Sequence, residues 1–291
     1  MTAGASFTKK LLNVTFVLKD GTFDGAHNTK VVSGLRVHCS VEKQGEPTKN
    51  KCKLKIYGMN RSDMNMLTSV PGQSAHALQV FHSLVRVDAG DENGMHMVYQ
   101  GDVTEAFSSY QQPPNLHFAV ESLTAFHGAI APAKPTSYKG GVDVATVMAS
   151  LAAQMGYGFE NNGVHAQINN PYLSGSAMSQ AGAIADAANI EFGVDDNTLF
   201  IAPTGQARNG LAPLISGGTG LHEYPIFDKK GIKFKCIYTP GLSLGGMCVV
   251  KSALGPPING TWRINGLKHE LTSLDPSARW ESHVTASWLG N

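Results

Sequence analysis

The sequence contains little charge. Lys, Arg, Asp and Glu make up 15% of its 291 residues, and 23 basic residues nearly balance 22 acidic ones, whereas about a quarter of the residues in an average soluble domain are charged. A chain with almost no net charge creates no long-range field, which excludes electrostatic steering toward nucleic acid, an anionic membrane or an acidic polymer. A surface poor in charge is instead typical of a protein that assembles with other proteins.

Cysteines and long apolar runs are also scarce. The four cysteines show no Cys-x-x-Cys spacing and lie in stretches that we interpret as strands: Cys39, Cys52, Cys236 and Cys248. They are predicted to be buried, reduced thiols. No stretch approaches the roughly 18 apolar residues that a membrane helix needs. The short apolar run in residues 9–21 lacks a small-residue cleavage site, so we expect a strand there, no stable membrane insertion and synthesis in a cytosol-like compartment.

Residues 11–125 follow the two-residue period of half-buried antiparallel strands. Apolar side chains alternate with polar ones from Leu35 to Val41, a turn follows, and residues 52–56 alternate on the way back. This pattern predicts a hairpin with one apolar face. A short helix is expected after the hairpin, capped by Asn60 or Ser62.

The period changes beyond residues 131–140, a stretch with several prolines and lysines that we interpret as a linker. Apolar side chains then recur at helical spacing between Asp143, a predicted N-cap, and Gly156, a predicted C-terminal stop. A second helix is predicted over about 176–189. A short hairpin around an Asp-Asp-Asn turn is predicted to follow it over 190–203.

Strand patterns return after a Gly-rich stretch at 204–220. All three tryptophans lie in residues 260–288, which we interpret as a long hairpin that ends a sheet. Gly266 permits a bulge in this hairpin, after which His269 is expected on the inner face.

The predicted fold class is therefore mainly β with a small α+β insert, and the β part is expected to form two antiparallel barrel or sandwich domains. In chain order, we expect a first β domain over 1–130, a linker over 131–140, the inserted α+β domain over 141–204, and a second β domain over 205–291 that could share strands from 95–130.

One segment imitates a serine hydrolase. Gly241 to Gly245 fit the Gly-x-Ser-x-Gly pattern, in which a strained serine joins a strand to a helix. Here Pro240 precedes the segment, and the residues after Gly245 are β-branched and strand-like. We predict a Gly-rich turn and no catalytic residue, with Ser243 as the candidate group only in an alternative function.

No metal, cofactor or phosphate site is predicted. The pair His269-Glu270 lacks the second histidine that a zinc-binding helix places four residues on, and a strand would put the two on opposite faces. An acidic group lacks the order of a calcium loop and is predicted to be a solvated hairpin tip; its members are Asp88, Asp91, Glu92 and Asp102. The glycine run from Gly217 to Gly220 is not followed by a helix pattern that would complete a phosphate site.

Four segments in a fixed order resemble tail hub proteins of contractile bacteriophages, which are related to the N-terminal part of type VI secretion spike proteins and to phage late control protein D. The segments span 35–67, 84–107, 141–157 and 238–287. The matching residues are Ile56, Tyr57 and Asn60, then Ala89, Gly90, Tyr99, Gly101 and Asp102, and finally Asn259, Gly260, Thr261, Ile264, Gly266, His269, Glu270 and Trp280. The predicted helix in the third segment falls where the family inserts a small α+β domain.

The resemblance implies two tail-tube-like β domains per chain, so that a homotrimer would present six similar domains to a hexameric tail tube and three-fold symmetry to a spike. It implies a non-enzymatic structural hub of the virion tail baseplate, assembled in the bacterial cytoplasm without a cofactor. The expected partners are the tail tube protein, the spike protein and other baseplate proteins, with DNA only as passing cargo. Two alternatives stay open, namely a distal tail or receptor-binding module and a tail-associated hydrolase that uses Ser243 or Glu270.

Overall fold

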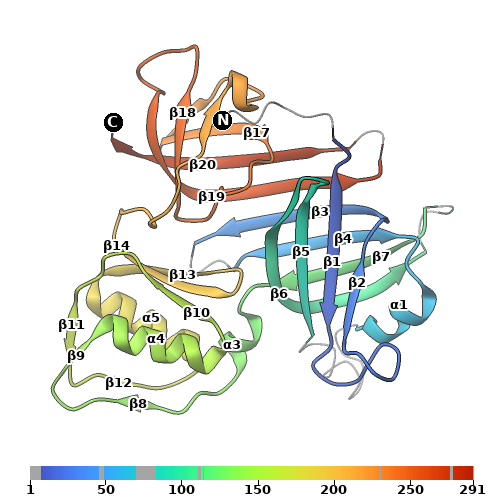
Figure 1. The fold of residues 1–291 in the computed structure, drawn as a ribbon. Coiled ribbons are helices and arrows are strands. Elements are labelled where there is room, and N and C mark those ends of the chain that lie inside the picture. Colours follow the sequence, from blue (N-terminus) through green and yellow to red (C-terminus); the bar gives the residue numbers. More distant parts are fainter. Residues whose placement is uncertain are drawn as a thin grey trace.

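The structure is a computed structural model that describes residues 8–45, 49–69, 83–110, 113, 115–229, 231–275 and 278–290. Figure 1 shows three lobes, which are a first β unit, an insert with helices, and a second β unit. Strands, nearly all in antiparallel pairs, make up about half of the described residues and far exceed the helices, so the predicted fold class is confirmed. Among the described residues, no helix is both long and apolar enough to cross a bilayer.

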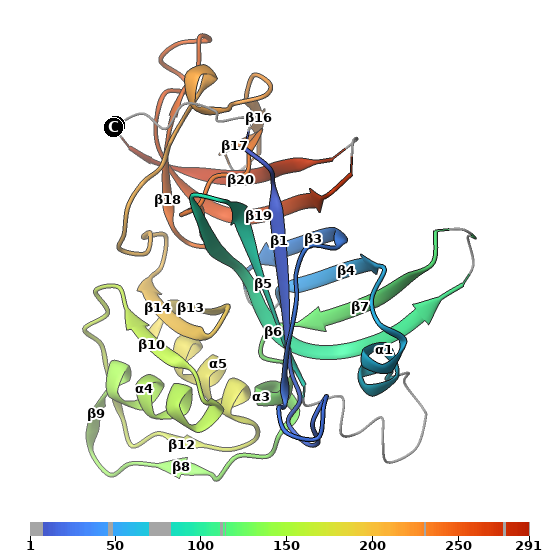
Figure 2. The same cartoon turned by 45° about the vertical axis from the view of Figure 1, so that its right-hand side comes forward.

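The first β unit is a sheet that folds over on itself. Its elements are β1 Leu11–Val17, β2 Thr29–Val32, β3 Arg36–Gln44, β4 Lys51–Tyr57, α1 Arg61–Leu67, β5 Leu84–Asp91, β6 Gly94–Ser109 and β7 His117–Leu123. Strand β6 pairs with β5 through its first part and with β7 through its last part, with a register shift between Val103 and Glu105. The strands β1, β2 and β5 therefore cross over β3, β4 and β7 (Figures 1 and 2), and residues such as Phe16 and Phe118 fill the core of this unit.

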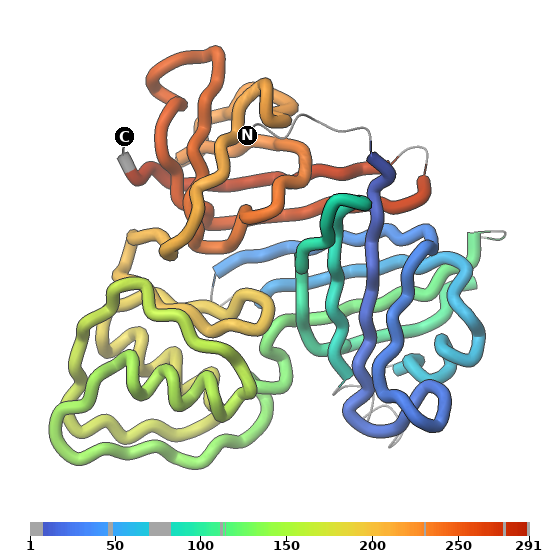
Figure 3. The backbone as a smooth tube through the Cα atoms, viewed as in Figure 1, coloured from blue at the N-terminus to red at the C-terminus, as the bar shows by residue number. Residues whose placement is uncertain are grey.

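The insert forms a lobe of its own (Figure 3) with a separate hydrophobic core. Its elements are α3 Phe126–Ile130, β8 Thr136–Ser137, β9 Gly141–Asp143, α4 Val144–Met155, β10 Gly158–Asn161, β11 Gln167–Asn169, β12 Tyr172–Leu173, α5 Ala177–Ala188, β13 Ile190–Asp195 and β14 Thr198–Pro203. The helices α4 and α5 pack on each other and on the three-stranded sheet β10-β14-β13. The expected linker at 131–140 contains β8, which pairs with β12, so this stretch is part of the insert's framework.

The local predictions for the helices are confirmed. Asn60 caps α1 by accepting a hydrogen bond from the backbone N of Ser62, and Asp143 caps α4 by accepting one from Thr146 N over 2.9 Å. Helix α4 ends at Gly156, whose φ of 78° lies in the left-handed region that glycine adopts without strain.

The second β unit contains β15 Leu214–Ser216, the 3-10 turn Gly217–Thr219, β16 Ile226–Asp228, β17 Gly231–Ile237, β18 Met247–Lys251, β19 Gly260–Ser273 and β20 Trp280–Gly290. Trp262, Phe234 and Val284 are among the buried residues of its core. The four cysteines of the chain are free and buried, as predicted.

Strand β19 joins the two β units into one sheet of 13 described strands. Its second half pairs with β3, from Gly266 opposite Gln44 to Ser273 opposite Val37. The predicted bulge is confirmed by the register shift between Ile264 and Gly266. The two units thus meet through β3 and β19 rather than through strands from 95–130, because β6 and β7 are already paired with neighbours inside the first unit.

Candidate functional site

One face of the shared sheet is polar from the second β unit to the first. We call it the polar sheet face, and it consists of the outward side chains of β17, β20, β19, β3, β4 and β7. Two rows follow the strand register directly: Lys235, His283, Lys268, Glu42 and Lys51, and next to them Glu281, Glu270, Ser40, Lys53 and Glu121. The reverse face carries the buried apolar residues of the two β cores.

Charges of opposite sign lie next to one another on this face. Glu121 accepts from Lys53 Nζ at 2.7 Å and from Lys51 Nζ at 2.9 Å, while Lys268 Nζ lies 2.7 Å from Glu270. Half-exposed ion pairs of this kind add at most about 1 kcal/mol of stability. Their main effect is a hydrated surface with balanced charge, which has no field that would hold a polyanion.

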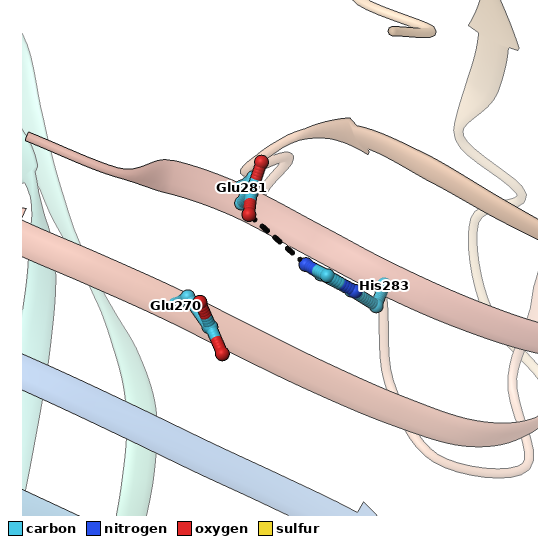
Figure 4. A group of neighbouring side chains, drawn as sticks. All are labelled: Glu270, Glu281 and His283. Carbon is cyan, nitrogen blue, oxygen red and sulfur yellow. Dashed lines mark hydrogen bonds and ion pairs between the residues drawn. The ribbon is translucent and has the colours of Figure 1, made fainter. Parts of the chain in front are cut away.

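The polar sheet face contains a compact group of metal-ligating side chains, Glu270, Glu281 and His283 (Figure 4). Glu270 on β19 lies directly opposite Glu281 on β20, and His283 Nε2 lies 3.0 Å from Glu281 Oε1. Lys268 and Arg279 both contact the carboxylate of Glu270 and lower its pKa to about 2. This group was not predicted from the sequence, because it forms through the register between two strands rather than through spacing along one.

The insert is fixed to the first β unit by a group of charges, buried except for the half-buried Glu160, that we call the joint cluster: Lys43, Glu160, Asp195, Asp196 and Arg208. Lys43 Nζ on β3 donates to Asp195 Oδ1 at 2.8 Å and to both carboxylate oxygens of Asp196 at 3.0 Å. Beside it, Asn50 Nδ2 donates to the backbone oxygen of Val194 at 3.0 Å. These contacts hold the turn between β13 and β14 against the end of β3.

Arg208 extends the joint cluster toward the second β unit. Its guanidinium donates to the two oxygens of Glu160 at 3.1 and 2.7 Å, and its Nη1 donates to Asp195 Oδ2 at 3.0 Å and to the backbone oxygen of Leu244 at 3.1 Å. The guanidinium carbon also lies 4.4 Å from the centre of the Phe200 ring. One side chain therefore contacts the insert and the second β unit together, and a planar guanidinium is suited to such divergent contacts.

The charges of the joint cluster respond to burial in different ways. Burial opposes the ionisation of Asp195, but Lys43 and Arg208 outweigh it and lower the pKa of that carboxyl below its ordinary value. Burial raises the pKa of Asp196 to about 6, aided by the neighbouring charge of Asp195. Burial likewise disfavours the charge of Lys43, yet its two carboxylate partners raise the pKa of the ammonium. Each buried ion thus depends on a specific partner.

His269 lies on the inner side of the sheet between Leu267, which belongs to the second β core, and Leu271, which belongs to the first. It is 2% exposed, and its Nδ1 lies 2.8 Å from the hydroxyl of Ser282. Burial, with a smaller effect of the charge on Lys43, lowers the pKa of His269 to about 3. The imidazole is therefore neutral at physiological pH, and Glu270 points to the opposite face as predicted.

The remaining candidates from the sequence lie apart from one another. Ser243 lies in the turn between β17 and β18, and the element that follows is a strand, so the predicted Gly-rich turn is confirmed. Asp91 lies at the tip of the β5–β6 hairpin, whereas Asp102 is buried farther along β6 and accepts from the backbone N of His127 at 2.9 Å. The glycines from Gly217 form a single 3-10 turn.

The joint cluster had one signal in the sequence. Lys43 occupies the next inward position on β3 after Val37, Cys39 and Val41. A lysine on an apolar face needs a buried anion as partner. Nothing in the local pattern names that partner, because Asp195 follows more than a hundred residues later and lies in what resembles an ordinary solvated turn.

Several solved structures of phage and secretion-system proteins have a fold similar to that of this chain. A tail protein from Neisseria meningitidis MC58 is 10% identical with a TM-score of 0.59, covering 94% of this chain and 96% of that one. The 43 kDa tail protein of prophage MuSo2 from Shewanella oneidensis is 8% identical with a TM-score of 0.60, covering 96% of each chain. At such identities the likeness establishes the fold.

A third structure is the E. coli c3393 protein, a type VI secretion component described as structurally similar to the T4 phage tail proteins gp27 and gp5. It is 9% identical to this chain with a TM-score of 0.56, covering 88% of this chain and 74% of that one. A search of curated proteins finds no match. The family profile described as baseplate hub gp41 matches residues 11–283, so the chain belongs to the baseplate hub gp41 family of structural phage tail proteins.

Proposed function

We propose that three copies of this chain form a closed ring that joins a hexameric tail tube to a trimeric spike and lets the genome pass through its centre. The polar sheet face lines the channel in this proposal, and the insert lies outside the ring, where other baseplate proteins bind. The ring assembles in the cytoplasm of the bacterial host, with the tail tube protein on one side and the spike protein on the other.

The observation that carries the proposal is the pairing of β3 with β19, which makes one sheet from two β units. Each chain therefore supplies two β units whose relative orientation is fixed by eight consecutive residue pairs, from Gly266 opposite Gln44 to Ser273 opposite Val37. Three copies of the chain related by a three-fold axis place six β units around a ring. A closed ring of this kind requires one surface of each copy to contact a different surface of the next copy.

The charge balance of the polar sheet face supports its assignment to the channel. Double-stranded DNA carries one negative charge per about 1.7 Å of its axis, and a wall with unpaired lysines would retain it. Here the two rows of the face hold four lysines and four glutamates: Lys51 and Lys53 share Glu121, and Lys268 contacts Glu42 and Glu270. A hydrated wall without excess charge lets the polymer slide. The position of Ser243 in a turn followed by a strand supports a structural role over hydrolysis.

The direct test is electron cryomicroscopy of this chain co-expressed with the spike protein of the same phage. We expect a ring with three copies, a central opening, and the outward residues of β4 and β19 facing that opening. A hexamer, a fibre-tip arrangement, or a ring whose opening is lined by the insert would contradict the proposal.

A further inference from the structure

The group at Glu270, Glu281 and His283 brings together side chains of the types that bind divalent metal ions. One ligating atom from each of the three side chains lies within 4.8 Å of the others. All three project from the paired strands β19 and β20, so the backbone fixes their positions (Figure 4). Two glutamates directly opposite each other on neighbouring strands repel, and the cations that contact Glu270 offset that repulsion in the metal-free chain.

A fourth donor lies beside them. His222 Nδ1 is 3.8 Å from Glu281 Oε2. The backbone of His222 is held in place because its N–H donates to the Lys235 oxygen at 3.0 Å, and Lys235 lies opposite His283 in the sheet. The group thus offers two imidazole nitrogens and two carboxylates, and is more than an acidic cluster.

We propose that Glu270, Glu281, His283 and His222 bind one Zn²⁺ per chain. Zinc is bound by histidine nitrogen and carboxylate oxygen at about 2.0–2.2 Å in a tetrahedron, which sets neighbouring donors about 3.4 Å apart. His283 Nε2 lies 3.0 Å from Glu281 Oε1, and His222 Nδ1 lies 3.8 Å from the other oxygen, Oε2, so both imidazoles are near this carboxylate. Binding of one ion by all four residues requires side-chain rotation, above all at His222, which lies outside the group of atoms within 4.8 Å of one another.

The cations that contact Glu270 are compatible with this site. Lys268 lies against one oxygen of Glu270 and Arg279 against the other. A carboxylate has about four lone-pair positions, so one oxygen can bind a metal while both cations remain as outer partners. The side chain of Arg279 is 68% exposed, so it can also turn into solvent at little cost.

Zinc at this position would connect three segments of the second β unit. It would link β19 and β20 to the segment at His222, which leads into the edge strand β16. A ligand that binds only the folded chain raises the unfolding midpoint, and the increase grows with ligand concentration. The site lies within one chain, so it does not depend on ring formation.

The test uses the full chain without a histidine tag, stripped with a chelator and titrated with ZnCl₂ by isothermal titration calorimetry. We expect one saturable Zn²⁺ per chain and a higher unfolding midpoint in its presence. Each of Glu281→Gln and His283→Asn is expected to weaken binding by at least about tenfold, and Glu270→Gln is expected to weaken it as well.

The matched control is His27→Asn, because His27 forms an exposed pair with Asp24 at 2.8 Å, and among the described residues this pair belongs to no group of three metal-ligating side chains. This variant should bind zinc like the wild type. The tested residues are half exposed, so circular dichroism should show all variants folded. The absence of saturable one-to-one binding in the wild type, or unchanged binding in Glu281→Gln and His283→Asn, would overturn the proposal whatever the state of the ring.

Discussion

Lys43 Nζ donates to Asp195 Oδ1 over 2.8 Å, and this hydrogen bond crosses from β3 of the first β unit to the end of β13 in the insert. The two side chains are 5% and 6% exposed, so both charges are removed from water. Apolar packing of the three lobes is divided among three separate cores. The charged contacts at Lys43 and Arg208 therefore help to fix how the insert is oriented on the two β units.

Replacement of Lys43 by methionine keeps the length of the side chain but leaves the adjacent carboxylates of Asp195 and Asp196 without their shared cation. Removing one partner of a buried ion pair costs about 3–5 kcal/mol. We expect a loss of this size in the free energy of unfolding, measured by urea denaturation. Lys53→Met is the control, because Lys53 pairs with Glu121 on the polar sheet face and its loss should cost no more than about 1 kcal/mol. Equal effects of the two variants would contradict the role of the joint cluster.

Replacement of Arg208 by lysine should destabilise the chain although it conserves the charge. A single ammonium cannot reproduce the contacts with Glu160, Asp195 and the Leu244 oxygen, and the groups left unpaired cost about 1–3 kcal/mol. Thermal unfolding followed by circular dichroism measures the loss. Arg86→Lys is a suitable comparison, since Arg86 makes a forked contact with Asp88 on the surface. If both lysine variants have the same unfolding midpoint as the wild type, the forked geometry of the guanidinium contacts does not contribute to stability.

His269 predicts a pH dependence of stability. Its pKa in the folded chain is about 3, below the ordinary 6.5, so between these values the unfolded chain binds more protons and stability falls as the pH falls. From pH 6.5 to pH 5 this residue should remove about 1.5 kcal/mol. Asp196 has the opposite effect on stability. Its pKa is raised to about 6 in the folded chain, so the folded chain binds the proton more readily and is stabilised as the pH falls through this value.

The variant His269→Gln separates these two effects. Glutamine does not titrate and can still form a hydrogen bond with Ser282. Between pH 6.5 and pH 5 the variant should therefore lose about 1.5 kcal/mol less of its free energy of unfolding than the wild type. Urea denaturation at the two pH values measures this difference. An identical pH dependence in the wild type and in His269→Gln would rule out a buried neutral imidazole.

The proposed channel predicts size-dependent access to Lys55, which is exposed on β4. Because the four native cysteines are buried, a Lys55→Cys variant offers one reactive thiol. In the complex with the spike protein we expect this thiol to react with a small thiosulfonate but slowly with a large polyethylene-glycol maleimide. Lys139→Cys, exposed on the insert, should react with both reagents. In the isolated chain the two positions should react alike. Rapid reaction of Lys55→Cys with the large reagent in the complex would place β4 outside the channel.

The sequence predicted the parts of the fold that depend on neighbouring residues. Asp143 and Gly156 predicted the two ends of α4, because helix capping and left-handed backbone are local requirements. Gly266 predicted the bulge in β19 for the same reason. The pairing of β3 with β19 was not predictable, since any edge with alternating residues satisfies the same pattern. The contacts of Lys43 and the meeting of Glu270 with Glu281 depend on that long-range register, so they became visible only in three dimensions.

The pairing of β3 with β19 also has a consequence for synthesis on the ribosome. The first β unit can fold once β7 has emerged, but the free edge of β3 has no partner until residues 266–273 have been translated. An open strand edge invites strands from other nascent chains. Premature termination before β19 should therefore yield a product that aggregates through β3. The final hairpin covers this strand edge and so protects the newly made polypeptide from aggregation.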